Sequence, residues 1–434
     1  MMTAALSDPA PTIRAHAEPL PPIDDPDFAA AFDRYADARV VLLGEASHGT
    51  SEFYRARAAI TRRLVERHGF SIVAVEADWP DAASIDRRVR GQAPRPDLGR
   101  PFSRFPTWMW RNAEVDALVG WMTEHNRGRP RAEQAGFYGL DLYNLAGATR
   151  AVIDYLDGVD PEAAQVARDR YGCLTPFRDD PERYGRKAWT QGYADCEEKV
   201  VEMLLDLFSR SQDYASVDDA AFLDAAQNAR TVANAEAYYR VMYQGSAESW
   251  NLRDRHMFDT LDLMLESYPG ARAVVWAHNS HIGDARETDM GRTREELNLG
   301  QLCREHYGAD ARLIGFGTHA GTVAAATDWD GPMEVKRVNP SRPDSWERMS
   351  HDAGHERFLL DLREPLDLGP DRLERFIGVI YRPDTERWSH YSESSLAREY
   401  DGWVWFDETS AVTPLPGAAD ASEPSADETW PFGV

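Results

Sequence analysis

The segment at residues 40–50 reads VVLLGEASHGT and decides the fold. Its first four residues form an apolar run that predicts a buried strand, and Glu45 and His48 follow the end of that run. Residues 51–68 then place apolar side chains at helical spacing, which predicts a helix. A strand that ends on an acid and an imidazole just before a helix is typical of open α/β proteins, whose ligands sit beyond the carboxyl ends of the strands.

Other short apolar runs, bounded by turn residues or helical stretches, recur along the chain. They predict strands at 72–75, 137–140, 273–276, 313–316, 376–381 and 403–406. Because the runs are continuous rather than alternating, they indicate parallel strands that are buried on both faces. Helices are predicted from about 80 to 91 and from 106 to 125, and then at 194–209, 217–243 and 252–267.

The order of these elements predicts an α/β fold with a mostly parallel central sheet, flanked by helices, and an inserted helical subdomain. Strand signals vanish between about residues 150 and 270, which indicates that this stretch is the insertion and forms one wall of a cleft. The predicted domains are a flexible arm at 1–26, an α/β catalytic core at 27–149 and 271–413, the insertion at 150–270 and a flexible acidic tail at 414–434.

Composition excludes several classes of protein. The net charge of −25 disfavours nucleic-acid binding, and no run approaches the roughly 18 apolar residues of a membrane span. The first residues lack the apolar stretch of a secretory signal. Three scattered cysteines make neither a disulfide framework nor a Cys-rich metal site, so a reducing cytoplasm is the simplest location. The sequence leaves the oligomeric state open.

Acids and imidazoles follow successive predicted strands. They are Glu45 and His48 after the first strand, Glu76 and Asp78 after the second, Asp141 after the third, and His278 and His281 after the fourth. Parallel strands bring such ends to one edge of the sheet, so these groups are expected to converge. Water-attack hydrolysis needs a base near neutral pKa and a carboxylate that orients it, and His48 is the strongest candidate for the base.

The pair at His278 and His281 admits two functional interpretations. One is a divalent-metal site in which Glu45, His48, Glu76 and one or both of these imidazoles are ligands. The other needs no metal: the imidazoles orient groups and donate to a developing oxyanion. A third, purely structural interpretation is that one His caps the turn that follows.

The remaining candidates are Arg57 and a set of pocket residues. Arg57 lies near the apolar stripe of its helix and is expected to pair inward with Glu45 or Glu76, whereas Arg55 is expected to be solvated. Substrate binding is predicted for side chains that could equally pack in the core: Trp108, Trp110, Asp141 and Tyr143. No serine sits in a Gly-x-Ser-x-Gly turn, and no nucleotide-binding glycine motif follows a strand.

Several separated motifs, in order, resemble the erythromycin esterase family. They are GEASHGTSEF at 44–53, AVEADWP at 74–80, FPTWMWRN at 105–112, YGLD at 138–141, WAHNSH at 276–281 and YRPDTE at 381–386. The similarity extends over about residues 35–415. The resemblance implies an α/β fold with a helical subdomain, and hydrolysis of an ester or lactone of a small molecule. Macrolide lactones are the namesake substrates, with antibiotic resistance as the result.

The resemblance also implies roles for individual residues. In enzymes of this kind a His takes a proton from water without a covalent intermediate, and by motif position that residue is His48. The supporting acids fall on Glu45 and Glu76, the arginine on Arg57, and the paired imidazoles on His278 and His281. No cofactor is implied. Two alternatives stay open: a divalent-metal-dependent hydrolase that uses the same residues, and a protein that binds a small ligand without turnover.

Overall fold

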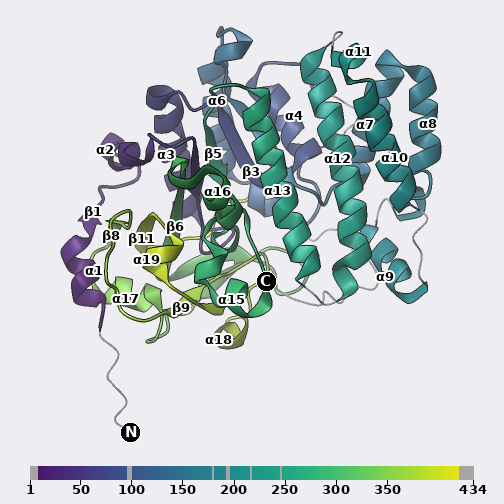
Figure 1. Ribbon diagram of the computed structural model, residues 1–434. Helices are drawn as coiled ribbons and strands as arrows, with labels where there is room; N and C mark the ends of the chain where they lie inside the picture. Colours follow the sequence, from purple (N-terminus) through teal and green to yellow (C-terminus); the bar gives the residue numbers. More distant parts are fainter. Residues whose placement is uncertain are drawn as a thin grey trace. The chain divides into compact units, whose positions relative to one another are not determined.

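The computed structural model describes residues 8–94, 100–177, 180–191, 196–215, 218–244 and 247–419 (Figure 1). The chain divides into two compact units, and three segments make the first: Met1–Val73, Phe102–Ala135 and Tyr268–Val434. The second unit consists of Ala74–Pro101 and Gly136–Ser267. Within the described ranges, no helix combines the length and the apolar character that crossing a membrane requires.

The described strands form a mixed, mostly parallel sheet, which confirms the predicted α/β class. In the first unit, parallel pairing joins β2 to β5 and β6, and β6 to β11, while β8 pairs antiparallel with β11. The short β1 continues the sheet beyond β8, and β7 pairs antiparallel with the far end of β6. The bounds are β1 Glu18–Pro19, β2 Val40–Leu43, β5 Ala273–Trp276, β6 Ala311–Ala325, β7 Glu334–Val338, β8 Arg357–Asp361 and β11 Gly402–Thr409.

Helix α3 (Ser51–His68) occupies the predicted range and packs on β5 and β11. Its buried face carries Phe53, Ala56, Ile60 and Leu64, and Gly69 ends it with a left-handed φ of 72°. The other helices of this unit are α1 Ala10–His16, α2 Pro26–Ala30, α5 Thr107–Trp110, α6 Ala113–Asn126, α14 Asn279–Ile282, α15 Asp289–Arg294, α16 Leu299–Tyr307, α17 Trp346–Asp352, α18 Glu386–Ser389 and α19 Leu396–Glu399. A separate two-stranded sheet pairs β9 (Arg372–Arg375) with β10 (Tyr391–Ser394).

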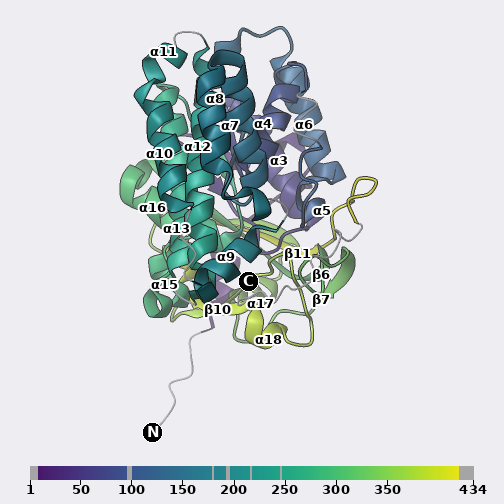
Figure 2. The ribbon, with the colours of Figure 1, turned by 90° about the vertical axis from the view of Figure 1, so that its right-hand side faces the viewer.

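The second unit is mainly helical, and besides most of the predicted insertion it includes residues 74–101 and 136–149, which the sequence assigned to the core. It holds β4 (Gly136–Asp141) and the continuation of β3 (Ile72–Asp78), whose first two residues belong to the first unit. Figure 2 shows α7, α8, α10 and α12 running side by side, and α12 packs on both α7 and α10. The α-helices of the second unit are α4 Trp79–Val89, α7 Leu145–Val159, α8 Pro161–Tyr171, α9 Pro181–Gln191, α10 Glu197–Ser209, α11 Ser211–Ala215, α12 Asp219–Val241 and α13 Glu248–Ser267.

A disulfide within the second unit differs from the expectation for the cysteines. Cys173 and Cys196 are bonded, and Cys303 in the first unit is free and buried. One bridge is not a framework. The location of the protein in the cell stays a prediction. The sequence could not show the bridge, since 23 residues separate the two cysteines and only the packing brings them together.

Two predicted elements differ in the structure. Residues 376–381 form no strand, and only isolated bridges at Ile377 and Ile380 join them to Ser47 and Ala326. The helix predicted at 106–125 is two helices, because the chain turns at Arg111 and Asn112 starts α6 by accepting the Val115 N–H.

The predicted N-terminal arm is wrong for residues 8–26. Ile13 of α1 is fully buried, and Arg14 donates to the carbonyls of Asp352 and Ala353, so this segment packs on the protein. Residues 1–7 lie outside the described residues, as do residues 420–434 of the predicted tail.

Candidate active site

The loop between β2 and α3 is held by backbone bonds and needs two glycines. The His48 N–H donates to Ile377 O at 3.1 Å, and Ile377 N–H donates to Ala46 O at 2.8 Å. Gly49 has a φ of +76°, and a Cβ there would lie 2.3 Å from Ala324 O. At Gly44, a Cβ would lie 2.1 Å from Asn279 Oδ1. The loop is therefore fixed against two neighbouring chain segments, which sets the direction of His48.

Glu45 joins His48 to Arg57 in the first unit. Its Oε1 lies 2.9 Å from His48 Nδ1, and its Oε2 accepts a 2.6 Å hydrogen bond from Arg57 Nη2. Glu45 is 1% exposed and His48 is 6% exposed, so little water competes for these bonds. A carboxylate can only accept, so His48 Nδ1 carries a proton, and the ring has a lone pair on Nε2 whenever it is neutral. That is the form of imidazole that takes a proton from water.

Arg57 is fully buried, and its position explains why it is an arginine. The guanidinium lies 4.5 Å from the Tyr54 ring centroid and 4.7 Å from that of Trp276. These contacts stabilise a cation that is removed from water, and Glu45 neutralises its charge. Of the two partners expected for Arg57, the structure selects Glu45. The neighbouring Arg55 is solvated as predicted and pairs with the exposed Asp24.

His278 brings a second imidazole to His48, with the complementary proton arrangement. The two ring centroids are 4.9 Å apart. His278 Nδ1 accepts the Ser280 N–H at 3.3 Å and lies 2.9 Å from Ser280 Oγ. A backbone N–H can only donate, so the neutral His278 ring carries its proton on Nε2. His278 thus caps the following turn, as the structural interpretation predicts, and still presents an N–H donor beside His48.

His281 lies in the short helix α14, three residues after His278, and is 2% exposed. Its backbone N–H donates to His278 O at 2.9 Å.

The metal alternative requires three or more ligands that share one ion. Across the part of the chain that the structure describes, no group of three or more His, Cys, Asp or Glu side chains is placed to hold a metal ion.

A second charged cluster, in the second unit, contains Glu76 and Asp141. Arg253 Nη2 donates to Glu76 Oε1 at 2.7 Å and to Asp141 Oδ2 at 2.6 Å, and its Nε donates to Asp141 Oδ1 at 3.0 Å. Burial alone would lower the pKa of Arg253, but Asp141, Tyr143 and Glu76 raise it well above its ordinary value. The cluster therefore keeps a permanent cation between two carboxylates.

The sequence analysis missed Arg253. It lies on α13 (Glu248–Ser267), 177 residues from Glu76, and two other charged residues, Asp254 and Arg255, follow it directly. Nothing in helical periodicity distinguishes it from those neighbours. Buried acids need a cation as a partner, however, and Glu76 and Asp141 each follow a predicted strand. Their need for a partner is the one signal in the sequence that could have indicated a further arginine.

The remaining predicted pocket residues are mostly packed. Tyr143 lies with its ring 5.0 Å from the Arg253 guanidinium, and burial raises the pKa of its hydroxyl well above its ordinary value. In the first unit, Trp108 and Trp110 are 1% and 7% exposed and contact Phe105 and Tyr54 respectively. Both indoles are therefore packed in the core, and their role in substrate binding remains a prediction.

Comparison with known proteins identifies the family. The family model described as erythromycin esterase matches residues 65–409, and the chain belongs to this family. Erythromycin esterase type II of Escherichia coli is 23% identical over 316 residues, covering 69% of this chain and 73% of that protein. The matched range begins after Glu45, His48 and Arg57, so their assignment depends on the residues themselves and on the geometry above.

Solved structures share the fold. A Bacillus cereus protein superposes with a TM-score of 0.79 at 19% identity, covering 94% of this chain and 98% of that chain. An erythromycin esterase mutant in its open conformation gives a TM-score of 0.69 at 19% identity, covering 91% of this chain and 98% of that one. At such identities the likeness establishes the α/β architecture, and the chemistry must be argued from the site.

Proposed function

We propose that this protein hydrolyses a carboxylic ester or a macrocyclic lactone of a small molecule, with His48 as the general base on water. The observation that carries the proposal is the buried pairing of His48 Nδ1 with Glu45 Oε1 at 2.9 Å. It directs the Nε2 lone pair of His48 outward from the carboxylate and stabilises the imidazolium that forms when water loses its proton. Membership of the erythromycin esterase family supports an ester as the substrate class.

Glu45 and Arg57 would tune the base. Glu45 fixes the tautomer of His48 and gains stabilisation from its contact with Arg57, 2.6 Å away. Neither side chain is exposed enough to touch bulk water, so both act through His48. The geometry thus gives His48 a fixed direction and a counter-charge for the moment when it becomes a cation.

His278 and His281 would stabilise the charge that develops on the carbonyl oxygen. The His278 tautomer places a hydrogen on Nε2, and its ring lies 4.9 Å from that of His48. An acceptor beside a donor is what attack of water on a carbonyl requires: one group takes a proton and the other donates to the oxyanion. Glu76 and Asp141 pair with Arg253 within the second unit, and their part in substrate binding stays a prediction.

The direct test is His48→Gln, which keeps the size and polarity of the side chain but removes the base. A panel of macrolides, simple lactones and aryl esters is scored by mass spectrometry for a gain of one water. We expect turnover by the wild-type protein and a loss of kcat of about 10²- to 10⁴-fold in the variant. Retained turnover by folded His48→Gln would refute the assignment of the base.

Two further measurements separate the alternatives. Intact-protein mass during turnover is expected to show no acyl adduct, since water attacks directly. Activity after treatment with a chelator is expected to be unchanged, and chelator-sensitive activity with a stoichiometric ion would favour the metal-dependent hydrolase. Ligand-induced stabilisation without any product would indicate a binding protein.

A further inference from the structure

A buried polar network lies directly behind the His278 turn. Its centre is Asn279, which is fully buried and joins three parts of the first unit. The Asn279 N–H donates to Glu45 O at 2.9 Å, and its Nδ2 donates to Phe316 O at 2.9 Å. Its Oδ1 accepts the Phe316 N–H at 3.3 Å. Asn279 therefore ties the turn that carries His278 both to the end of β2 and to β6.

Asn279 is itself held by a buried carboxylate on β9. Glu374 is fully buried, and its Oε1 accepts from Asn279 Nδ2 at 3.2 Å and from Tyr400 OH at 2.7 Å. Its Oε2 accepts from Ser394 Oγ at 2.8 Å. In all three of these contacts Glu374 is the acceptor.

A second buried carboxyl, that of Glu399, interacts electrostatically with Glu374. Glu399 is 1% exposed and feels the charge of Glu374. Burial and then the charge of Glu374 raise the pKa of Glu399 well above its ordinary value. Burial and then the charge of Glu347 raise the pKa of Glu374 to about 7. Both carboxyls therefore favour their protonated forms more than an exposed glutamate does.

Glu374 and Glu399 contact the chain at the two ends of α14 (Asn279–Ile282). Glu374 holds the first residue, Asn279, and Glu399 lies against Gly283, where a Cβ would be 2.4 Å from Glu399 Oε1. The Asp284 N–H also donates to Glu399 O at 3.1 Å. The helix that carries His281 and follows His278 therefore has no freedom to shift without breaking contacts to one carboxyl or the other.

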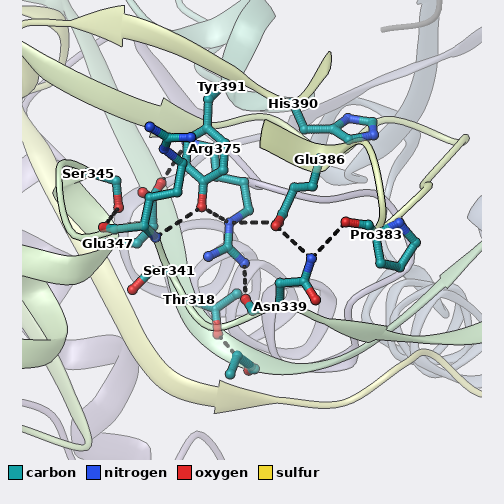
Figure 3. Close-up of polar contacts among 12 residues, drawn as sticks. Thr318, Asn339, Ser341, Ser345, Glu347, Arg375, Pro383, Glu386, His390 and Tyr391 are labelled. Atoms are coloured by element: carbon teal, nitrogen blue, oxygen red, sulfur yellow. Dashed lines mark hydrogen bonds and ion pairs between the residues drawn. The ribbon is translucent and has the colours of Figure 1, made fainter. Parts of the chain in front are cut away.

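Glu374 is fixed from its other side by the network in Figure 3. Its neighbour Arg375 donates through Nε to Tyr391 OH at 2.9 Å and through Nη1 to Asn339 O at 3.1 Å, and lies 3.4 Å from Glu386 (Figure 3). Successive side chains of a strand point to opposite faces. The anchored arginine on one face thus fixes the position of the carboxylate on the other.

We propose that Glu374 is a positioning residue of the hydrolase: through Asn279 it fixes the His278 turn against Glu45 and so sets the spacing between His278 and His48. The proposal rests on the proposed function. It extends the site to residues that touch neither substrate nor the reacting atoms. Glu374 affects the rate only by keeping two imidazoles in the geometry that the transition state requires.

The test compares Glu374→Leu, which removes the acceptor, with two matched variants. Glu374→Gln keeps an amide oxygen that can accept from Asn279, and Tyr400→Phe removes the other donor to the same oxygen. We expect Glu374→Leu to lower kcat by about 10- to 100-fold with KM nearly unchanged, because small misplacements of catalytic groups have effects of this size. Glu374→Gln should restore most of the activity, and Tyr400→Phe should keep kcat within about 2-fold, since it leaves the Asn279 bond intact.

A double-variant cycle distinguishes positioning from general loss of stability. If Glu374 acts through Asn279, the combination of Glu374→Leu with Asn279→Ala lowers kcat no further than Asn279→Ala alone. Additive losses of kcat, or equal losses in Glu374→Leu and Tyr400→Phe, would overturn the proposal. If Glu374→Leu does not fold, Asn279→Ala and Tyr400→Phe decide: the first must lower kcat at least about 10-fold and the second must not.

The outcome is separable from that of the proposed function. Should His48→Gln remain active, the hydrolytic assignment fails whatever Glu374 does. Should His48→Gln be inactive while folded Glu374→Leu keeps the wild-type kcat, the hydrolytic assignment stands and the positioning role is wrong.

Discussion

At the scale of single residues, the first unit places charges where water cannot reach them and gives each a specific partner. Glu45 is the clearest case, because one carboxylate oxygen contacts His48 and the other accepts a hydrogen bond from Arg57. A buried ion pair contributes little net stability compared with an apolar pair, but loss of one partner is costly since the other charge stays buried. The arrangement therefore indicates a requirement of function rather than of folding.

Arg57 and Arg55 offer a matched pair for testing this cost. Arg57→Met leaves the Glu45 carboxylate buried without its cation, so we expect the free energy of unfolding to fall by about 3–5 kcal/mol. Arg55 pairs with Asp24 at an exposed position, where side-chain exposures are 41% and 82%. Arg55→Met should cost less than about 1 kcal/mol. Urea denaturation of both variants measures the difference, and equal costs would contradict the role given to Arg57.

At the scale of elements, the sequence predicted those strands and helices that have a clear apolar run or an apolar stripe. The strand at β2 and the helix at α3 have the predicted bounds, because a continuous apolar run and an apolar stripe are local signals. The strands β1, β7, β8, β9 and β10 were missed, since none of them has an apolar run longer than the three residues 358–360 of β8 and most of their other residues are charged or polar. Their formation depends on pairing with segments far along the chain.

The candidate site divides in the same way. Residues that directly follow a strand, such as Glu45, His48 and His278, could be found from the sequence because the strand itself marks them. Arg253 and Glu374 could not: the first lies within a helix of mixed charge, and the second lies in a strand without an apolar run. What identifies them is the buried partner each one contacts, and that is a property of the folded chain.

The loop and helix that carry His48 allow a second matched comparison, at the two ends of α3. Gly49 and Gly69 have similar left-handed φ values, +76° and +72°, but a Cβ would meet Ala324 O at 2.3 Å in the first and nothing within 4 Å in the second. We expect Gly69→Ala to cost about 1 kcal/mol from backbone conformation alone. Gly49→Ala should cost at least about 2 kcal/mol and displace the adjacent His48.

Activity separates these two effects. Thermal denaturation gives the cost of each substitution, and kcat on the best substrate of the panel reports on His48. Gly69→Ala is expected to keep the wild-type kcat, and Gly49→Ala to lose it in the protein that remains folded. A Gly49→Ala variant with full activity would show that the loop tolerates the shift and that the direction of His48 is not set there.

At the scale of the whole molecule, buried groups with shifted pKa values make stability depend on pH in two opposite directions. Burial lowers the pKa of His256 in the second unit and of His390 in the first unit from 6.5 to about 4. Burial and the charge of Glu347 raise the pKa of Glu374 from 4.5 to about 7. The imidazoles resist protonation in the folded state, and the carboxyl favours it.

These shifts give a signed prediction for two variants. The folded state binds fewer protons than the unfolded state at His390, so its contribution is lost as pH falls from about 6.5 towards 4, by about 2 kcal/mol at pH 5. The folded state binds more protons at Glu374, so stability is lost there as pH rises from about 4.5, by about 2 kcal/mol at pH 6 and about 3 kcal/mol at pH 7. The stability of His390→Gln relative to the wild-type protein should therefore increase as pH falls. That of Glu374→Gln should increase as pH rises.

Urea denaturation at pH 5, 6, 7 and 8 measures both variants against the wild-type protein, with His16→Gln as the control for loss of one exposed imidazole. Glutamine retains a donor for the Phe376 carbonyl that His390 Nδ1 contacts at 3.2 Å, so the comparison isolates the titration from the hydrogen bond. The two difference curves must slope in opposite directions, because one group is buried neutral and the other is buried among like charges. Parallel slopes would show that at least one of these groups does not titrate as its surroundings require. A flat curve for Glu374→Gln would show that the Glu374–Glu399 pair does not take up a proton in this pH range.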